Sequence, residues 1–380
     1  MKKSKKSKLY NQILGILFLL YAAGFGFFLS MTLFSGFFNL IEVAVGVAGI
    51  IASYYLSIII HEGGHLVFGL IAGYGFSSFR IASVMWVKQD GRIRLRRFKL
   101  AGSGGQCLMT PPQGSETKGQ TVLYNMGGVI ANVILSVAFA LLYYLSLNTV
   151  LLALIFLLGA AVSFFVAITN GIPFNAGVIV NDGMNAIQLL KDPDAKDAFR
   201  KQLLMNAAQN RGMLTVDMPD EWFTLSEGAD MQNTHCASIA VFSAGRSLDR
   251  LDTLTAERDI EILLNSDYNI SGLHRNLLTC DLIFCRLINS DAPDISGLLT
   301  PELDKFMRSM KQYPSILRTR YAIALLVTGD NKTAEKIAAE FDKVAKKHPY
   351  PCNIEVERGL IGKALGKNQK QNIKQGRTTK

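Results

Sequence analysis

The feature that most constrains this chain is a set of long stretches without charged residues. Leu9–Leu40, Val43–Ile60 and Gly119–Asn181 contain no Asp, Glu, Lys or Arg. A membrane-spanning helix needs about 20 consecutive apolar residues, so these stretches predict helices that cross a lipid bilayer. Leu9–Leu40 is too long for the apolar core of a signal peptide, and we therefore predict a retained helix over about 10–32.

The other two stretches predict three more crossings. A second helix is expected from Leu40 to about Ala72. Gly119–Asn181 is long enough for two helices, expected at 121–146 and 150–170, and Pro173 prevents the last one from continuing as a regular helix. The chain is thus expected to be an α-helical polytopic membrane protein with about four transmembrane helices.

Composition and charge agree with a membrane protein and indicate its orientation. Hydrophobic residues make up 49% of the 380 residues and charged residues 18%, with a net charge of +10. The positive residues cluster in residues 1–8, in the 80–99 stretch and in the last fifteen residues, where they suit anionic lipid headgroups. The positive-inside rule predicts that both termini are cytoplasmic. No nucleic-acid-binding motif accompanies the clusters, so no nucleic-acid partner is expected.

The cysteines and the chain start indicate a compartment. The five cysteines include no CxxC pair, which argues against a disulfide framework and fits a reducing cytosol. No organelle-targeting feature accompanies the lysine-rich start. We therefore expect a multi-pass protein of a bacterial cell membrane.

The second apolar helix leads into the sequence His61-Glu62-Gly63-Gly64-His65. On a helix, the two histidines of an HExxH sequence lie one turn apart on the same face and can share one zinc ion. Glu62 can then take a proton from a water at the metal. Such a pentapeptide also recurs by chance, but two imidazoles and a carboxylate at membrane depth are costly to bury and favour a function. A zinc site also needs a third ligand from elsewhere in the chain.

The segment between the second and third helices is expected to form strands. Ser78–Lys88 and Arg92–Leu100 flank Asp90-Gly91, a dipeptide typical of hairpin turns. The alternation from Arg92 to Arg96 predicts a strand with one basic and one apolar face. A third extended piece is expected from Gly102 to Pro112. Together these residues form a small membrane-associated β-sheet over 76–109, with an edge on which an extended peptide can pair.

Residues 193–366 are expected to form a soluble α-helical domain on the cytosolic side. Residues 322–338 predict two helices joined by a tight turn at Gly329-Asp330-Asn331, which is similar to one tetratricopeptide hairpin, although no full repeat period is established. The polar, basic residues 367–380 are expected to be disordered. The chain is thus expected to comprise residues 1–38, with the basic tail and first helix, residues 39–192, the membrane core, residues 193–366, the soluble helical domain, and residues 367–380, the disordered tail.

Three separate motifs resemble the site-2 protease family of intramembrane zinc metalloproteases. They are the HExxH helix, the segment Gly127-Gly128-Val-Ile-Ala-Asn132, and Asn170-Gly-Ile-Pro173 followed by Asn181-Asp182-Gly183. The chain departs from the family pattern at Gly128, where proline is usual, and at Asn181, where leucine is usual. The motifs occur in the family's order over about 40–190, whereas residues 195–380 show no resemblance.

The resemblance implies one Zn2+ per chain, held by His61, His65 and Asp182, with Glu62 as the catalytic residue. Asp182 can also be a simple helix cap. The resemblance further implies that Asn132, Asn170, Gly104 and Gly105 contact the substrate or a reaction intermediate. Hydrogen bonding between helices is an alternative role for the two asparagines.

The function expected from the sequence is therefore that of an intramembrane zinc metalloendopeptidase. Its substrate is a membrane-embedded peptide or protein, such as a transmembrane regulator or a signal-peptide-like segment, and its cytosolic domain would recruit a protein partner. The alternatives are a proteolytically inactive relative that acts as a membrane scaffold and a zinc-handling protein. A transporter subunit is disfavoured because the sequence shows no inverted repeat.

Overall fold

The computed structural model describes residues 2–34, 38–89, 91–98, 103–114, 116–173 and 180–374. Contacts divide the chain into two compact units. The first unit comprises Met1–Ile81 and Gly104–Pro193, and the second comprises Ala82–Ser103 and Asp194–Lys380.

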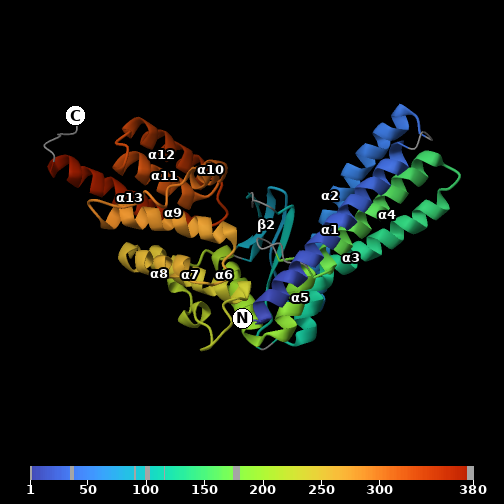
Figure 1. Cartoon of the computed structure of the whole chain (residues 1–380), viewed down its shortest axis with the longest axis horizontal. Helices are drawn as coiled ribbons and strands as arrows, with labels where there is room; N and C mark the ends of the chain where they lie inside the picture. The colour runs from blue at the N-terminus through green and yellow to red at the C-terminus, as the bar shows by residue number, and fades with distance from the viewer. Residues whose placement is uncertain are drawn as a thin grey trace. The chain divides into compact units, whose positions relative to one another are not determined.

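The first unit is built on four long apolar helices, drawn from blue to green in Figure 1. Within them, four segments are long and apolar enough to cross a membrane, as the sequence predicts. Large apolar side chains such as Leu19 and Tyr144 remain 68% and 72% exposed, an arrangement that suits contact with lipid rather than water. The helices are α1 (Lys2–Phe34), α2 (Leu40–Ile71), α3 (Lys118–Leu145) and α4 (Val150–Gly171), and a shorter helix, α5 (Asp182–Lys191), follows them.

Small residues allow α2, α3 and α4 to approach one another closely. A Cβ atom added to Gly64 of α2 would lie 2.3 Å from the Gly127 carbonyl oxygen of α3, so the two backbones are in contact there. Ser57 of α2 and Ser163 of α4 share a buried hydrogen bond of 2.9 Å. Close backbone contacts and polar pairs of this kind hold helices together in lipid, because the hydrophobic effect does not drive helices to associate there.

Two strands accompany these helices in the first unit. Strand β1 (Gly75–Ile81) pairs antiparallel with β4 (Gly105–Thr110), with Phe79 opposite Cys107 and an irregularity between Phe76 and Ser78. The Tyr124 hydroxyl of α3 donates a 2.9 Å hydrogen bond to the Cys107 carbonyl oxygen, which fixes β4 against the helices. The expected third extended piece is therefore present from Gly105, while 99–102 lie outside the described residues.

The predicted hairpin forms, but its strands are shorter than expected. Strand β2 (Val84–Gln89) pairs antiparallel with β3 (Arg92–Arg97) across the two-residue turn, of which Gly91 has a φ of 74° and Asp90 lies outside the described residues. The prediction of one strand over Ser78–Lys88 is wrong, because the backbone turns at Ala82, whose φ is 51°. An alanine in this left-handed region gives no sequence signal of a turn.

The β2–β3 hairpin belongs to the second unit, although the sequence placed it in the membrane core. The Phe98 ring lies edge-on to three rings from the helical part of that unit, those of Tyr313, His348 and Tyr350, with centroids 6.4, 5.9 and 6.2 Å away. The Gln89 side-chain amide also donates a 3.0 Å hydrogen bond to the Pro349 carbonyl oxygen. These contacts attach the hairpin to the helices that follow residue 193.

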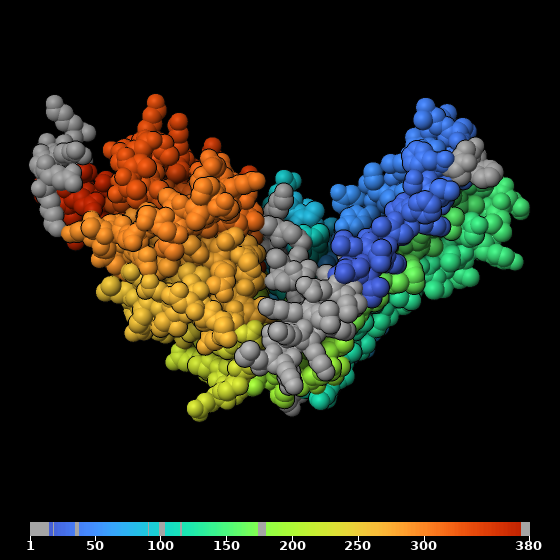
Figure 2. All heavy atoms as spheres, viewed as in Figure 1, coloured from blue at the N-terminus to red at the C-terminus, as the bar shows by residue number. Residues whose placement is uncertain are grey.

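The remainder of the second unit is helical, as predicted. Buried apolar side chains from α7 to α13 form one continuous core that includes Ile283, Phe284 and Leu317, and Figure 2 shows these helices as a continuous body of atoms from yellow to red. The predicted helix–turn–helix is present, with Gly329 at a φ of 63°. The helices are α6 (Pro193–Asn210), α7 (Thr234–Asp249), α8 (Thr253–Asn265), α9 (Gly272–Asn289), α10 (Pro301–Ser309), α11 (Pro314–Leu326), α12 (Asn331–Ala345) and α13 (Pro351–Lys374), with single 3-10 turns at Thr215–Asp217 and Asp220–Phe223.

The expected disorder of 367–380 is wrong for its first part, since α13 continues to Lys374. Lysine and glutamine are good helix formers, and the Lys367 ammonium donates hydrogen bonds to the Ile288 and Ser290 carbonyl oxygens at the end of α9. Residues 375–380 lie outside the described residues.

Candidate metal centre

Helix α2 presents His61, Glu62 and His65 inside the first unit. Their exposed fractions are 8%, 9% and 8%, so all three polar side chains are buried. The i, i+4 spacing of the histidines brings their Nε2 atoms to 3.2 Å from each other. Two imidazole nitrogens this close need a shared cation or proton between them, because their lone pairs otherwise repel.

Asp182 reaches the same place from the beginning of α5. Asn181 precedes it and connects α5 to the end of α4: its side-chain amide donates to the carbonyl oxygens of Thr169 and Ile172, at 2.9 and 2.6 Å. Its amide oxygen accepts a 3.0 Å hydrogen bond from the Met184 backbone and caps α5. The chain thereby folds back, and the Asp182 carboxylate faces the two imidazoles.

Gly183 is required for this return of the chain. A Cβ atom added there would lie 2.0 Å from the Gly171 carbonyl oxygen of α4, closer than any side chain allows. Only glycine lets the two backbones approach in this way.

The three side chains form a triangle of candidate metal ligands. Asp182 Oδ2 lies 3.0 Å from His61 Nε2 and 3.4 Å from His65 Nε2, which completes the 3.2 Å side between the imidazoles. Tetrahedral ligands at zinc bond lengths of about 2.0 Å lie about 3.3 Å from one another. The donor set and its spacing therefore fit one zinc ion.

The protonation states of the three groups also fit a metal. Burial alone would raise the pKa of the Asp182 carboxyl, but attraction to His65 and hydrogen bonds with both imidazoles outweigh it and hold this pKa below its ordinary value. Asp182 is thus a carboxylate at neutral pH. His65 Nδ1 lies 2.8 Å from the Tyr124 carbonyl oxygen, which can only accept, so Nδ1 carries a proton. Nε2 is then the nitrogen that faces Asp182 and that can bind a metal once it gives up its own proton.

His61 is oriented by Asn132 of α3, which is completely buried. The Asn132 amide nitrogen lies 3.0 Å from His61 Nδ1, and its amide oxygen has no hydrogen-bond partner among the described residues. A histidine that binds metal through Nε2 carries its proton on Nδ1 and needs an acceptor there. Rotation of the amide by 180° places its oxygen at Nδ1 and supplies that acceptor. Asn132 can therefore orient His61 for a metal at Nε2.

Glycines of α3 and β4 shape the space around these side chains. A Cβ atom added to Gly128 would lie 2.7 Å from the Nε2 atoms of both His61 and His65. One added to Gly105 would lie 2.5 Å from Glu62 Cγ. The imidazoles thus lie directly against α3 and the glutamate against β4, so neither position accepts a larger residue without displacing them.

The remaining predicted site residues lie in different surroundings. Gly104 faces Ile58, one turn before Glu62 on α2, at 3.1 Å from an added Cβ. The Asn170 amide donates a 2.9 Å hydrogen bond to the Val166 carbonyl oxygen of its own helix, rather than to the histidines or to another helix. The structure thus brings Asn132 to the metal ligands and leaves the Asn170 amide bonded within α4.

Sequence reasoning missed three contributors to the site. They are the Tyr124 carbonyl oxygen, Gly128 and Asn181, none of which has the side chain of a metal ligand. They nevertheless orient or enclose the three candidate metal ligands. The two departures from the family pattern, at Gly128 and Asn181, were the available clues. Both are now explained by close contact with the site.

Two imidazoles, a carboxylate and a neighbouring glutamate, carried on apolar helices, are the set of groups that defines a membrane metallopeptidase. The family model of peptidase family M50 matches residues 49–346, and the chain therefore belongs to this family of membrane metalloproteases. The match also includes most of the helical region, so the expectation that the resemblance ends near residue 190 is wrong. Comparison with curated proteins and with solved structures gave no match.

Proposed function

We propose that this protein is a zinc endopeptidase that cleaves a transmembrane or signal-peptide-like segment within the membrane. The observation that carries the proposal is the triangle of His61, His65 and Asp182, with Glu62 next to His61 on the same helix. Zinc, when bound, lowers the pKa of water and polarises a peptide carbonyl. His61, His65 and Asp182 hold the ion, one per chain, and leave a fourth position open.

Glu62 is the proton carrier in this proposal. Its carboxylate takes a proton from the attacking water and returns it to the leaving amine nitrogen, which requires a position beside the ligands and shelter from bulk water. Both conditions fit its 9% exposure and its contact with Gly105. Arg80 is also buried in this unit, and its guanidinium donates a 3.2 Å hydrogen bond to the Gly105 carbonyl oxygen, which supports the strand against which Glu62 lies.

Strand β4 is the part of the site best placed to hold an unwound substrate. A helical segment hides its peptide bonds and must become extended before attack, and an extended segment can pair with a strand edge. Among the described residues β4 pairs with β1 on one side only, and Gly105 places β4 beside Glu62. Proline introduced at successive positions of Gly105–Thr110 should impair cleavage more than zinc binding. Equal loss of both in every variant would contradict substrate pairing.

The protein is proposed to reside in a bacterial cell membrane with both termini in the cytoplasm. The lysines of residues 1–8 and the arginines of β3 support this orientation by the positive-inside rule. In this arrangement the helical unit, which we propose to be tetratricopeptide-like, meets protein partners in the cytosol, and the basic clusters meet anionic headgroups.

Glu62→Gln tests the proposed function and separates it from a scaffold role. Membrane peptides from cells with the wild-type protein and with the variant are compared by mass spectrometry, and zinc is measured in both purified proteins. Glu62→Gln should retain zinc and lose specific cleavage products. Glu42→Gln on the same helix is the matched control, because glutamine keeps the capping interaction of Glu42 with Asn39. Identical peptides in wild type and Glu62→Gln would favour the inactive scaffold.

A further inference from the structure

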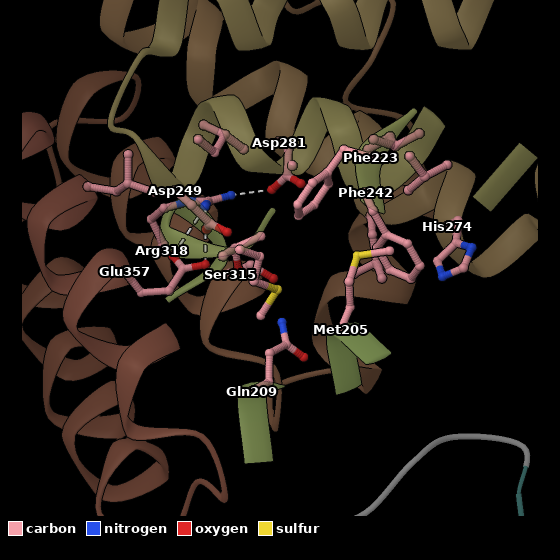
Figure 3. Close-up of a pocket in the computed structure, with 18 of the residues that line it drawn as sticks. Met205, Gln209, Phe223, Phe242, Asp249, His274, Asp281, Ser315, Arg318 and Glu357 are labelled. Atoms are coloured by element: carbon pink, nitrogen blue, oxygen red, sulfur yellow. Dashed lines mark hydrogen bonds and ion pairs between the residues drawn. The ribbon is translucent and has the colours of Figure 1, made fainter. Parts of the chain in front are cut away.

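The helical unit contains a partly open cavity of about 280 Å³, formed by α6, α7, α9, α11 and α13 together with the two 3-10 turns (Figure 3). Its volume is near the lower end of the range for small-molecule sites, about 300–1,000 Å³, and is sufficient for one amino-acid side chain with its backbone. The walls are largely apolar, with Met205, Phe223, Phe242 and Leu278 among them. Charged groups from four helices face this cavity.

Arg318 is the only cation among the described residues that line the cavity, and it is already engaged. Its side chain is 1% exposed and donates hydrogen bonds to Asp281 and, at 3.1 Å, to Glu357. Its guanidinium also lies over the Phe284 ring, 4.5 Å from the centroid. Burial raises the pKa of Glu357 to about 7, so the guanidinium and its two carboxylates carry one negative charge in excess when Glu357 is ionised.

Asp249 adds a third carboxylate to the same cavity. It forms no ion pair within 4.0 Å among the described residues, and Figure 3 shows it near Arg318 and Glu357. Burial, reinforced by Asp281, raises its pKa to about 6. Burial likewise lowers the pKa of His274 on the opposite wall, so this imidazole supplies no positive charge at neutral pH. A hydrogen bond with Thr215 and the charge of Arg318 offset only part of the effect of burial on Asp249. Above pH 6 the Asp249 carboxylate therefore adds a negative charge to a cavity whose one guanidinium is already paired.

One hydrogen-bonding group of the cavity also lacks a protein partner. The Gln209 side-chain amide extends towards the cavity in Figure 3 and makes no hydrogen bond within the described part of the chain. An amide offers both a donor and an acceptor, as a peptide group does. A ligand that satisfies this group carries a peptide bond as well as a positive charge.

We propose that this cavity binds the basic side chain of an extended peptide segment, a lysine or arginine, with its cationic end at Asp249. The apolar stem of such a side chain would lie against Phe242 and Met205, since long basic side chains cover apolar surface while their charged end reaches a partner. The peptide backbone of the ligand would meet the Gln209 amide. This inference concerns the helical unit alone and does not rest on the proposed proteolysis.

The test is a ligand-observed NMR titration of the detergent-solubilised full-length protein with three probes. The probes are acetyl-Gly-Ala-Lys-Ala-Gly-amide, the same peptide with alanine in place of lysine, and n-pentylammonium. The proposal expects the lysine peptide to bind at least about tenfold more tightly than either other probe, a difference of about 1.4 kcal/mol. Equal affinities of the two peptides would overturn the cation site. Equal affinities of the lysine peptide and n-pentylammonium would overturn the assignment to a peptide.

Two variants connect the preference to this cavity. Asp249→Asn should abolish the preference for lysine over alanine, whereas Asp267→Asn, the same change at an exposed position, should retain it. Gln209→Ala leaves every charge in place and should weaken the lysine peptide about tenfold, which tests the contact with the peptide backbone independently of Asp249. An unchanged preference in folded Asp249→Asn, or an unchanged affinity in Gln209→Ala, would contradict the proposal.

Discussion

Gly128→Ala should disable the metal centre although it replaces none of the three metal ligands. The added Cβ would lie 2.7 Å from Nε2 of both His61 and His65, whereas nonbonded heavy atoms prefer about 3.5 Å or more. Each ring would have to move by about 0.8 Å, and metal sites tolerate deviations of about 0.2 Å. Retreat of α3 from α2 would instead break the close backbone contact of Gly127 with Gly64.

The expected result is a loss of zinc affinity of at least about 10- to 100-fold, the range seen when groups that orient metal ligands are removed. Competition with a chromogenic chelator measures this affinity in detergent. Each tenfold loss also removes about 1.4 kcal/mol of the stabilisation that saturating zinc provides, so the rise in melting temperature on adding zinc should shrink.

Gly63→Ala is the matched control, because it makes the same change within the HExxH sequence itself. A Cβ added at Gly63 has no atom within 4 Å, and alanine in place of glycine favours a helix by about 0.5–1 kcal/mol. This variant should bind zinc like the wild type and melt no lower. If Gly128→Ala also bound zinc with wild-type affinity, the histidines would not be confined by α3 as described.

Two further predictions concern other parts of the molecule. Asn181→Ala removes the cap of α5 and both hydrogen bonds to the end of α4. It should therefore lower the free energy of unfolding by about 1 kcal/mol and reduce the zinc affinity about tenfold, as measured by competition with a chelator. An unchanged zinc affinity would show that Asp182 is positioned without Asn181. Asp249 has a folded-state pKa of about 6 against an ordinary value of 3.8, so its charge destabilises the folded state above pH 6 and has no effect below about pH 4. Asp249→Asn should therefore stabilise the protein by up to about 3 kcal/mol at pH 8, and thermal melts should show the gain disappear towards pH 4. A gain in stability that does not depend on pH would contradict this prediction. The other charged or titratable groups that line the same cavity are Asp281, Glu357, Arg318 and His274.

The spanning helices and the two histidines could be predicted because each depends on local sequence. An uncharged stretch such as Gly119–Asn181 has few alternatives to crossing a membrane, and the four-residue spacing of His61 and His65 fixes their common face on any helix. Asp182 was a different case, because nothing in its own neighbourhood points to a metal. Its assignment as a ligand came from family resemblance, and the return of the chain after Pro173 explains how it arrives.

What the sequence could not predict depends on contacts between distant residues. The Tyr124 carbonyl orients His65 only because α3 crosses α2 at Gly64 and Gly127, and a backbone oxygen leaves no trace in the sequence. The attachment of the β2–β3 hairpin to the helical unit depends on the rings around Phe98, which come from residues more than two hundred positions later.

The ligand set itself is tested most directly by the zinc K-edge X-ray absorption spectrum of the full-length protein loaded with one zinc ion per chain. The account predicts a first shell of nitrogen and oxygen atoms at about 2.0 Å, with the multiple scattering of two imidazoles and no sulfur. The one cysteine of the first unit is Cys107, whose thiol is buried on β4 and could supply a sulfur ligand instead. A sulfur shell at about 2.3 Å, or a spectrum without imidazole scattering, would contradict a centre made of His61, His65 and Asp182.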